Sequence, residues 1–124
     1  MNSRIPLILA LLALSGAAAA VTPAEFQAAL GSGFSANRGE AFYRDTHGGD
    51  WSCATCHTDN PATVGSHAVT KKAIKPLAPA ANAERFTNPE KIEKWFKRNC
   101  NDVLKRPCTP QEKGDFLAFL LTVK

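Results

Sequence analysis

The chain has 124 residues, 44% of them hydrophobic, and a formal net charge of +4 at pH 7. This length fits one domain with a modest core, and the charge density is far below that of a nucleic-acid-binding protein. A mildly basic surface instead suits an acidic protein partner, which it would attract before contact.

The first twenty residues have the pattern of a secretory signal peptide. Arg4 gives a positive start, Ile5 to Leu14 form a short apolar run, and the small residues ending at Ala20 resemble a cleavage site. The apolar run is too short for a comfortable membrane span. We expect residues 1–20 to be removed on export to the periplasm, leaving residues 21–124 as the mature domain. An uncleaved anchor is the alternative.

Two short helices are expected before residue 45. Thr22 to Glu25 form a capping box with proline at the first helical position, and Gly31 is a typical residue at a helix end. The second helix is expected over residues 36–44. Gly39 lies inside it, where glycine costs about 1 kcal/mol relative to alanine. This position therefore predicts a close approach by another element.

The stretch from Trp51 to His57 contains Cys53, Cys56 and His57 in the order Cys-x-x-Cys-His. This is the attachment motif of haem c: the two sulfurs form thioethers with the porphyrin vinyl groups, and the histidine binds the iron. A single covalently attached haem c with its iron is therefore the expected cofactor.

Two other kinds of site use a Cys-x-x-Cys pair. A thioredoxin-like dithiol belongs in a βαβ unit, but Gly48-Gly49-Asp50 and a polar loop flank this motif. A zinc site needs two further ligands at finger-like spacing, and Cys100 and Cys108 form no second such pair. Haem attachment explains the motif better than either.

The segment after the motif is expected to be irregular. Residues 58–70 are polar and predict a loop, and Pro76-Leu77-Ala78-Pro79 is too stiff to continue a long helix. We expect this proline-containing stretch to wrap the haem edge. A backbone carbonyl from it would accept a hydrogen bond from the second ring nitrogen of His57.

Asn88-Pro89 predicts the start of the next helix. Glu93 and Lys97 have the i,i+4 spacing of an ion pair on its solvated face. Its apolar stripe has residues at helical spacing: Ile92, Trp95 and Phe96, with Asn99 one turn later.

The last segment contains two cysteines and a final helix. Cys100 and Cys108 are free to bridge in an oxidising compartment, and closing so short a loop stabilises by about 2–3 kcal/mol. Thr109 to Glu112 repeat the capping box and begin a helix that carries Phe116 and Phe119. The whole pattern predicts a small all-α domain whose N- and C-terminal helices pack on each other.

Met1 is the only methionine, and it would leave with the signal peptide. The mature domain therefore cannot use the His/Met ligation of many small cytochromes c. His67 is one candidate for the second axial ligand, and His/His ligation would make a plain electron carrier. It lies in a polar loop, however, where solvation is the commoner fate. His47 is expected on the proximal side or at the surface.

The order of helix, Cys-x-x-Cys-His, loop, helix and aromatic last helix resembles the class I cytochromes c. Gly39 with Tyr43, and Phe116 with Phe119, match the helix crossing of that family. Within it the chain is most similar to the oxygen-binding group of the sphaeroides haem protein, over most of the sequence from Tyr43 onward. The similarity rests on four stretches: Pro76-Leu77-Ala78-Pro79, Arg85-Phe86-Thr87, Lys94-Trp95-Phe96-Lys97-Arg98-Asn99-Cys100-Asn101 and Cys108-Thr109-Pro110.

This resemblance implies that an asparagine, here Asn99, is the second axial ligand, and that Cys100 and Cys108 form a disulfide. It also implies that the asparagine leaves the iron on reduction, so that dioxygen, nitric oxide or carbon monoxide can bind. A dihaem cytochrome c is the implied electron donor. An amide oxygen is a hard ligand that suits ferric iron better than ferrous iron, which agrees with release on reduction.

The expected function is therefore an exported monohaem c-type cytochrome with His/Asn ligation that binds a diatomic molecule when reduced, with oxidase-like turnover left open. The alternative is a plain periplasmic electron-transfer cytochrome c without an open ligand site. Neither interpretation includes a nucleic-acid partner or a stable membrane span. Carbon monoxide binding to the reduced protein distinguishes the two.

Overall fold

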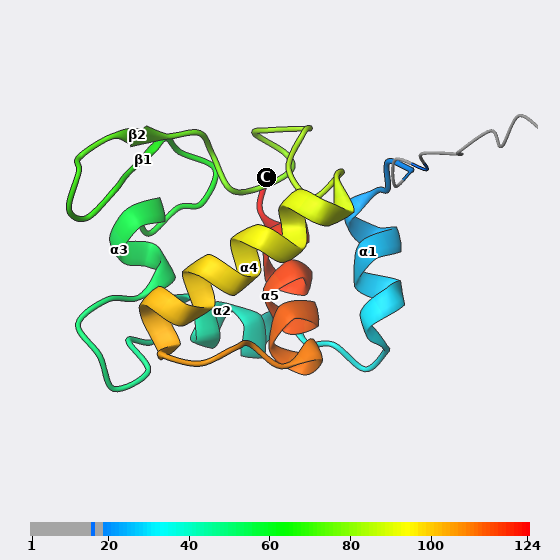
Figure 1. Cartoon of the computed structure of the whole chain (residues 1–124), viewed down its shortest axis with the longest axis horizontal. Helices are drawn as coiled ribbons and strands as arrows, with labels where there is room; N and C mark the ends of the chain where they lie inside the picture. The colour runs from blue at the N-terminus through cyan, green and yellow to red at the C-terminus, as the bar shows by residue number, and fades with distance from the viewer. Residues whose placement is uncertain (1–15, 17–18) are drawn as a thin grey trace, which may run out of the picture.

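The computed structural model describes residue 16 and residues 19–124. Apart from residues 16, 19 and 20, the predicted signal peptide lies outside the described residues. Among the described residues, no helix combines the length and hydropathy that a membrane crossing requires. The elements along the described chain (Figure 1) are α1 (Pro23–Leu30), α2 (Ala36–Arg44), α3 (Cys53–His57), β1 (Gly65–Ser66), β2 (Ala73–Ile74), α4 (Pro89–Leu104) and α5 (Pro110–Thr122).

The helix starts follow from local capping, as the sequence predicts. Thr22 accepts a hydrogen bond from the Glu25 N–H at 3.1 Å, and the Glu25 carboxylate accepts one from the Thr22 N–H at 3.0 Å. Thr109 and Glu112 repeat this capping box at the start of α5. Asn88 caps α4 by accepting from the Lys91 N–H at 3.1 Å. Such caps contribute about 1 kcal/mol each.

The central packing contact is the crossing of α2 and α5, onto which α1 also packs. A Cβ on Gly39 would overlap the backbone carbonyl of Asp115, so only glycine permits this approach. Tyr43 from α2 is fully buried against Phe119, with ring centroids 5.4 Å apart. The predicted packing of the N- and C-terminal helices is confirmed, and so is the helical fold class.

A buried carboxylate holds the same crossing together. Asp115 is 5% exposed and accepts hydrogen bonds from Arg38 Nε at 2.8 Å, the Ser35 N–H at 2.7 Å and Gln111 Nε2 at 3.0 Å. Burial alone would raise the pKa of Asp115, but these bonds, that from Arg38 first, hold it below its ordinary value. The ionised carboxylate therefore stabilises the folded state.

Part of the predicted loop forms a short antiparallel ladder. Gly65 lies opposite Ile74, and Ser66 lies opposite Ala73. A Cβ on Gly65 would overlap the carbonyl of Cys56, so this hairpin packs directly on α3. The two-residue strands are too short to leave a period-2 pattern in the sequence.

Helix α4 crosses in front of α5 in Figure 1 and meets it through side chains. The rings of Phe96 and Phe116 lie 5.8 Å apart. The predicted Glu93–Lys97 pair is wrong: Lys113 Nζ of α5 lies 3.0 Å from Glu93 Oε2 instead. A cation from a neighbouring helix thus replaces the local partner that sequence spacing suggested.

We expect Asp115→Asn to lower the free energy of unfolding by about 1.5–3 kcal/mol at neutral pH, because the new amide N–H group would face the donors that the carboxylate now accepts from. The pKa of Asp115 is lower in the folded protein. Its contribution is therefore present above about pH 4 and is lost as the pH falls through the folded-state pKa. Urea unfolding followed by circular dichroism at neutral pH and near the folded-state pKa measures both effects.

The matched control is Asp59→Asn. The Asp59 side chain is 99% exposed, and its Oδ1 atom lies 3.7 Å from Arg44 Nη1, which is long for an ion pair. This exposed pair should contribute less than about 1 kcal/mol. Equal losses in the two variants, or a loss in Asp115→Asn that does not shrink in acid, would contradict the assigned role of Asp115.

Candidate haem site

The Cys-x-x-Cys-His motif forms its own short helix, α3. Ser52 Oγ accepts from the Thr55 N–H at 3.2 Å, and Thr55 Oγ1 accepts from the Ser52 N–H at 2.9 Å, which makes a capping box. Thr58 ends the helix with a φ of 67°. Its carbonyl accepts a hydrogen bond from the buried hydroxyl of Tyr43. The helix crossing therefore fixes the position of the motif.

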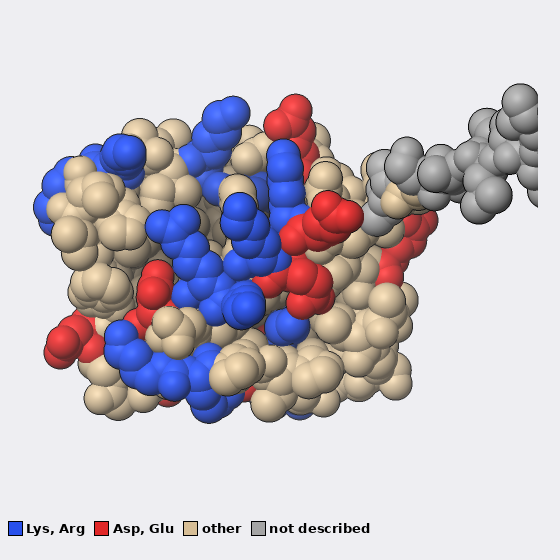
Figure 2. All heavy atoms as spheres, in the orientation of Figure 1, with Lys and Arg blue, Asp and Glu red and all other residues tan. Residues whose placement is uncertain are grey.

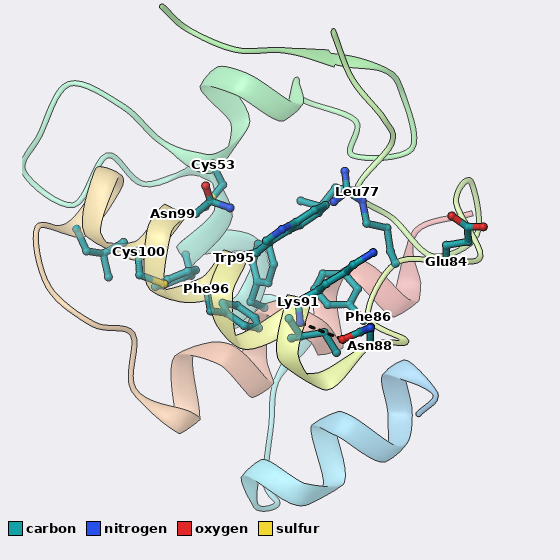
Figure 3. A pocket seen from close by; sticks show the side chains of 15 residues that line it. Cys53, Leu77, Glu84, Phe86, Asn88, Lys91, Trp95, Phe96, Asn99 and Cys100 are labelled. Carbon is teal, nitrogen blue, oxygen red and sulfur yellow. Dashed lines mark hydrogen bonds between the residues drawn. The ribbon is translucent and has the colours of Figure 1, made fainter. Parts of the chain in front are cut away.

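An apolar pocket lies between α3, α4 and the segment that connects β2 to α4. It encloses about 730 Å³ of empty space, part of it open to solvent. Cys53 and Leu77 line one part, and Ile92, Phe96 and Asn99 of α4 line another. Figure 3 shows Cys53 and Asn99 next to each other at the same end of the pocket. The motif and the second ligand candidate thus belong to one site.

Not every predicted site residue lines this pocket. Cys56 and His57 lie on α3 with Cys53, but they are not among the residues that line the pocket. The two motif cysteines are both free and partly buried. On α4 the predicted stripe is only half buried: Trp95 is 46% exposed and Asn99 is exposed. Both exposed residues border the pocket rather than the packed core.

The two cysteines after Asn99 are joined. Cys100 and Cys108 form a disulfide with their Cα atoms 5.7 Å apart, and both side chains are buried. Cys100 also lines the pocket directly after Asn99. The disulfide therefore fixes the backbone of Asn99 relative to the start of α5.

Burial sets the protonation of the motif. It lowers the pKa of His57 to about 4, with a further decrease from the positive charge of Arg85. A neutral imidazole is the form that binds a metal. Burial also raises the pKa of Cys53 to about 12, with a smaller increase from Cys56. Such a protonated thiol does not fit a reactive dithiol, which needs the anion.

The alternative metal sites have little support. Within the described part of the chain, no group of three or more His, Cys, Asp or Glu side chains could hold a metal ion. His67 accepts hydrogen bonds at Nδ1 from the N–H groups of Val69 and Thr70, both at 3.1 Å. His47 has Nε2 2.9 Å from the carbonyl oxygen of Phe42. Both histidines have local partners, and neither lines the apolar pocket.

The proline-containing segment is near the pocket, as expected, because Leu77 lines it. The expected carbonyl partner of His57 is not found: no hydrogen bond of the His57 ring occurs among the described residues. Instead Arg85 donates from Nε to the Pro76 carbonyl at 3.0 Å and from Nη2 to the Lys75 carbonyl at 2.8 Å. The spacing of Arg85 does not separate it from fourteen other Lys and Arg residues, although it belongs to one of the stretches on which the family resemblance rests.

These residues fit a covalently bound haem. Cys53 and Cys56 supply the two thiols on one helical turn, and His57 supplies a neutral imidazole. The pocket beside Cys53 is mostly apolar, as the porphyrin ring requires. Arg85 adds a buried positive charge without a carboxylate partner among the described residues, and haem brings carboxylates.

Comparisons with known proteins agree with this fit. The chain matches the family described as a domain of unknown function (DUF1924) over residues 29–120. It is 40% identical, over an alignment of 126 positions, to the cytochrome c-type protein SHP of Cereibacter sphaeroides, covering 95% of this chain and 97% of that protein. It is 49% identical over 80 residues to cytochrome c'' of Methylophilus methylotrophus, a match that covers 64% of this chain and only 56% of that protein.

Two solved structures are also similar. Oxidized SHP, described as an oxygen-binding cytochrome c, has a TM-score of 0.75 at 42% identity, covering 81% of this chain and 96% of that one. The solution structure of cytochrome c'', described in terms of haem-ligand detachment, has a TM-score of 0.63 at 43% identity, covering 80% and 83%. The chain therefore belongs to the DUF1924 family and is a c-type cytochrome of the SHP and cytochrome c'' group, with covalently attached haem c as its cofactor.

Proposed function

We propose that this protein is an exported monohaem cytochrome that binds dioxygen or another diatomic molecule when reduced. In this proposal His57 and Asn99 would hold the ferric iron, and Asn99 would release it on reduction. The observation that carries the proposal is that Cys53 of the attachment motif and Asn99 line the same apolar pocket.

The haem supplies an iron that changes oxidation state and can take one ligand on each side of the ring. Cys53 and Cys56 hold it through thioethers, and burial keeps the His57 ring neutral. The crossing of α2 and α5 fixes α3 through Tyr43 and Thr58. The proximal side is therefore rigid.

Asn99 has the properties that a releasable ligand needs. Its backbone lies in α4 beside a disulfide, whereas its side chain is exposed and makes no hydrogen bond to a described residue. Rotation of the side chain alone can thus move the amide without moving the helix. The amide oxygen suits ferric iron, and the freed amide N–H group can donate a hydrogen bond to dioxygen.

The relatives support this order of events. Oxygen binding is described for SHP and haem-ligand detachment for cytochrome c''. This chain resembles both at more than 40% identity in the structural comparisons. A plain electron carrier with a histidine opposite His57 is the second possibility, but the ring of His67 is already held by backbone N–H groups.

The surface beside the pocket suits an acidic electron donor. Figure 2 shows Lys and Arg gathered over α4, where the exposed cations are Lys91, Lys94, Lys97 and Arg98. Opposite charges would steer an acidic partner to this face. We propose a dihaem cytochrome c as that donor, in the periplasm, where the disulfide is stable.

The exported protein should begin near Val21 and carry one haem linked through Cys53 and Cys56. Intact-mass analysis after export checks this, because thioether-linked haem adds its mass to the polypeptide and stays attached in acid acetone. Cys53→Ala with Cys56→Ala should abolish the attachment. A mass that equals the bare polypeptide, or one that still includes residues 1–20, would contradict attachment or cleavage respectively.

Asn99→Val keeps a similar volume but removes both the oxygen ligand and the amide donor. We expect the ferric absorption spectrum to shift to a high-spin or water-ligated form, while the reduced protein still binds carbon monoxide. Dioxygen binding should weaken by about 1–2 kcal/mol, the contribution of one hydrogen bond. Absorption spectroscopy of both oxidation states, with ligand titration, measures these changes.

Two control variants accompany this experiment. Asn101→Val makes the same change at an exposed position of the same helix and should leave both spectra unchanged. His67→Ala should do the same. If His67→Ala alters the ferric spectrum strongly and Asn99→Val does not, the ligand is His67 and the proposed release of Asn99 is wrong.

A further inference from the structure

Arg85 is a buried charge whose surroundings are incomplete. It is only 7% exposed, yet no ion pair joins it to a carboxylate among the described residues. Its Nε and Nη2 atoms donate to the backbone carbonyls of Pro76 and Lys75, while Nη1 makes no hydrogen bond to a described residue and reaches the accessible surface. A buried guanidinium without an anion is costly, and burial accordingly lowers the pKa of Arg85.

The position of Arg85 points to the missing anion. Arg85 lines the apolar pocket, and it also lines a second, more polar hollow. Four other residues line both hollows, Glu84, Asn88, Lys91 and Trp95, and Lys75 lies in the second. Glu84 is exposed and forms no ion pair with Arg85. Of the two cations that line the apolar pocket, Lys91 is exposed and Arg85 is buried.

The guanidinium is held in a defined place. It lies over the ring of Trp95, 4.4 Å from the ring centroid, and its two backbone hydrogen bonds tie it to the segment before Leu77. Arg85 is thus held in place where it lines both hollows.

We propose that Arg85 binds a propionate carboxylate of the haem through Nη1 and neutralises its charge inside the protein. Haem brings two carboxylates into a mostly apolar pocket, and a guanidinium is the side chain best suited to a buried carboxylate. The resulting pair connects the haem edge to the Lys75–Pro76 backbone and to Trp95. Because the pair leaves less negative charge at the haem than an unpaired propionate would, Arg85 also favours the ferrous state.

This inference rests on the proposed haem site and is tested in the haem-loaded protein. Arg85→Gln should lower the reduction potential, because reduction adds an electron beside a carboxylate that is no longer neutralised. The propionate bending band in the resonance Raman spectrum should shift, since it responds to hydrogen bonding of the carboxylate. Arg85→Lys keeps the charge but not the planar donor set, and it should give a smaller change in potential with a clear shift of the band.

The matched control is Arg98→Gln, which removes the same charge from an exposed arginine of α4 that lines neither hollow. It should leave the propionate band unchanged and the potential nearly so. If Arg85→Gln lowers thermal stability but leaves potential and propionate band at their parent values, Arg85 only holds the backbone and the inference is overturned. If the glutamine variant fails to fold, an unchanged propionate band in Arg85→Lys overturns the inference instead.

The parent protein separates this failure from failure of the haem site. Covalent haem and carbon monoxide binding in the parent, together with an unchanged propionate band in both Arg85 variants, would overturn only the role of Arg85. Absence of covalent haem in the parent would overturn the site itself.

Discussion

The close crossing of α2 and α5 determines the geometry of the rest of the protein. Gly39 lets the two backbones approach until a Cβ no longer fits, and Asp115 closes the contact by accepting hydrogen bonds from Arg38 and Ser35. The same crossing buries Tyr43, whose hydroxyl donates to the carbonyl at the end of α3. The attachment motif is thus oriented by a contact that contains none of its own residues.

The opposite wall of the pocket is fixed in another way. Helix α4 meets α5 through the rings of Phe96 and Phe116 and through Lys113 with Glu93, and the Cys100–Cys108 disulfide connects the two helices covalently. These contacts hold the backbone of α4, whereas the Asn99 side chain at the pocket is exposed and makes no hydrogen bond to a described residue. A rigid helix with a free amide side chain is what a ligand released on reduction requires.

How far the sequence predicts this structure depends on the range of each interaction. The capping boxes at Thr22 and Thr109 and the short motif helix involve neighbours three or four residues apart, so the pattern reveals them. The close approach at Gly39 is predictable because glycine inside a helix is unfavourable without a packing reason.

The exposure of Trp95 is not predictable, since helical periodicity cannot distinguish a packed core from a pocket wall. The burial of Arg85 shows the same limit, because it depends on contacts with Trp95 and with the carbonyls of Lys75 and Pro76 that no local pattern records. For the same reason the spacing of Glu93 and Lys97 predicts an ion pair within α4, whereas Glu93 forms its ion pair with Lys113 of α5.

The two proposed contacts of the haem have opposite effects on the relative stability of the ferric and ferrous states. A hard amide oxygen from Asn99 stabilises the ferric state, whereas a buried guanidinium paired with a haem carboxylate stabilises the ferrous state, because opposite charges attract strongly where water is excluded. The Asn99 side chain can leave once the iron is reduced, because its amide oxygen binds ferrous iron more weakly. Arg85, in contrast, is fixed by two backbone carbonyls and Trp95. In the proposed site Arg85 therefore stays paired with the haem carboxylate after the amide departs. This asymmetry favours the reduced, open form to which a diatomic ligand binds.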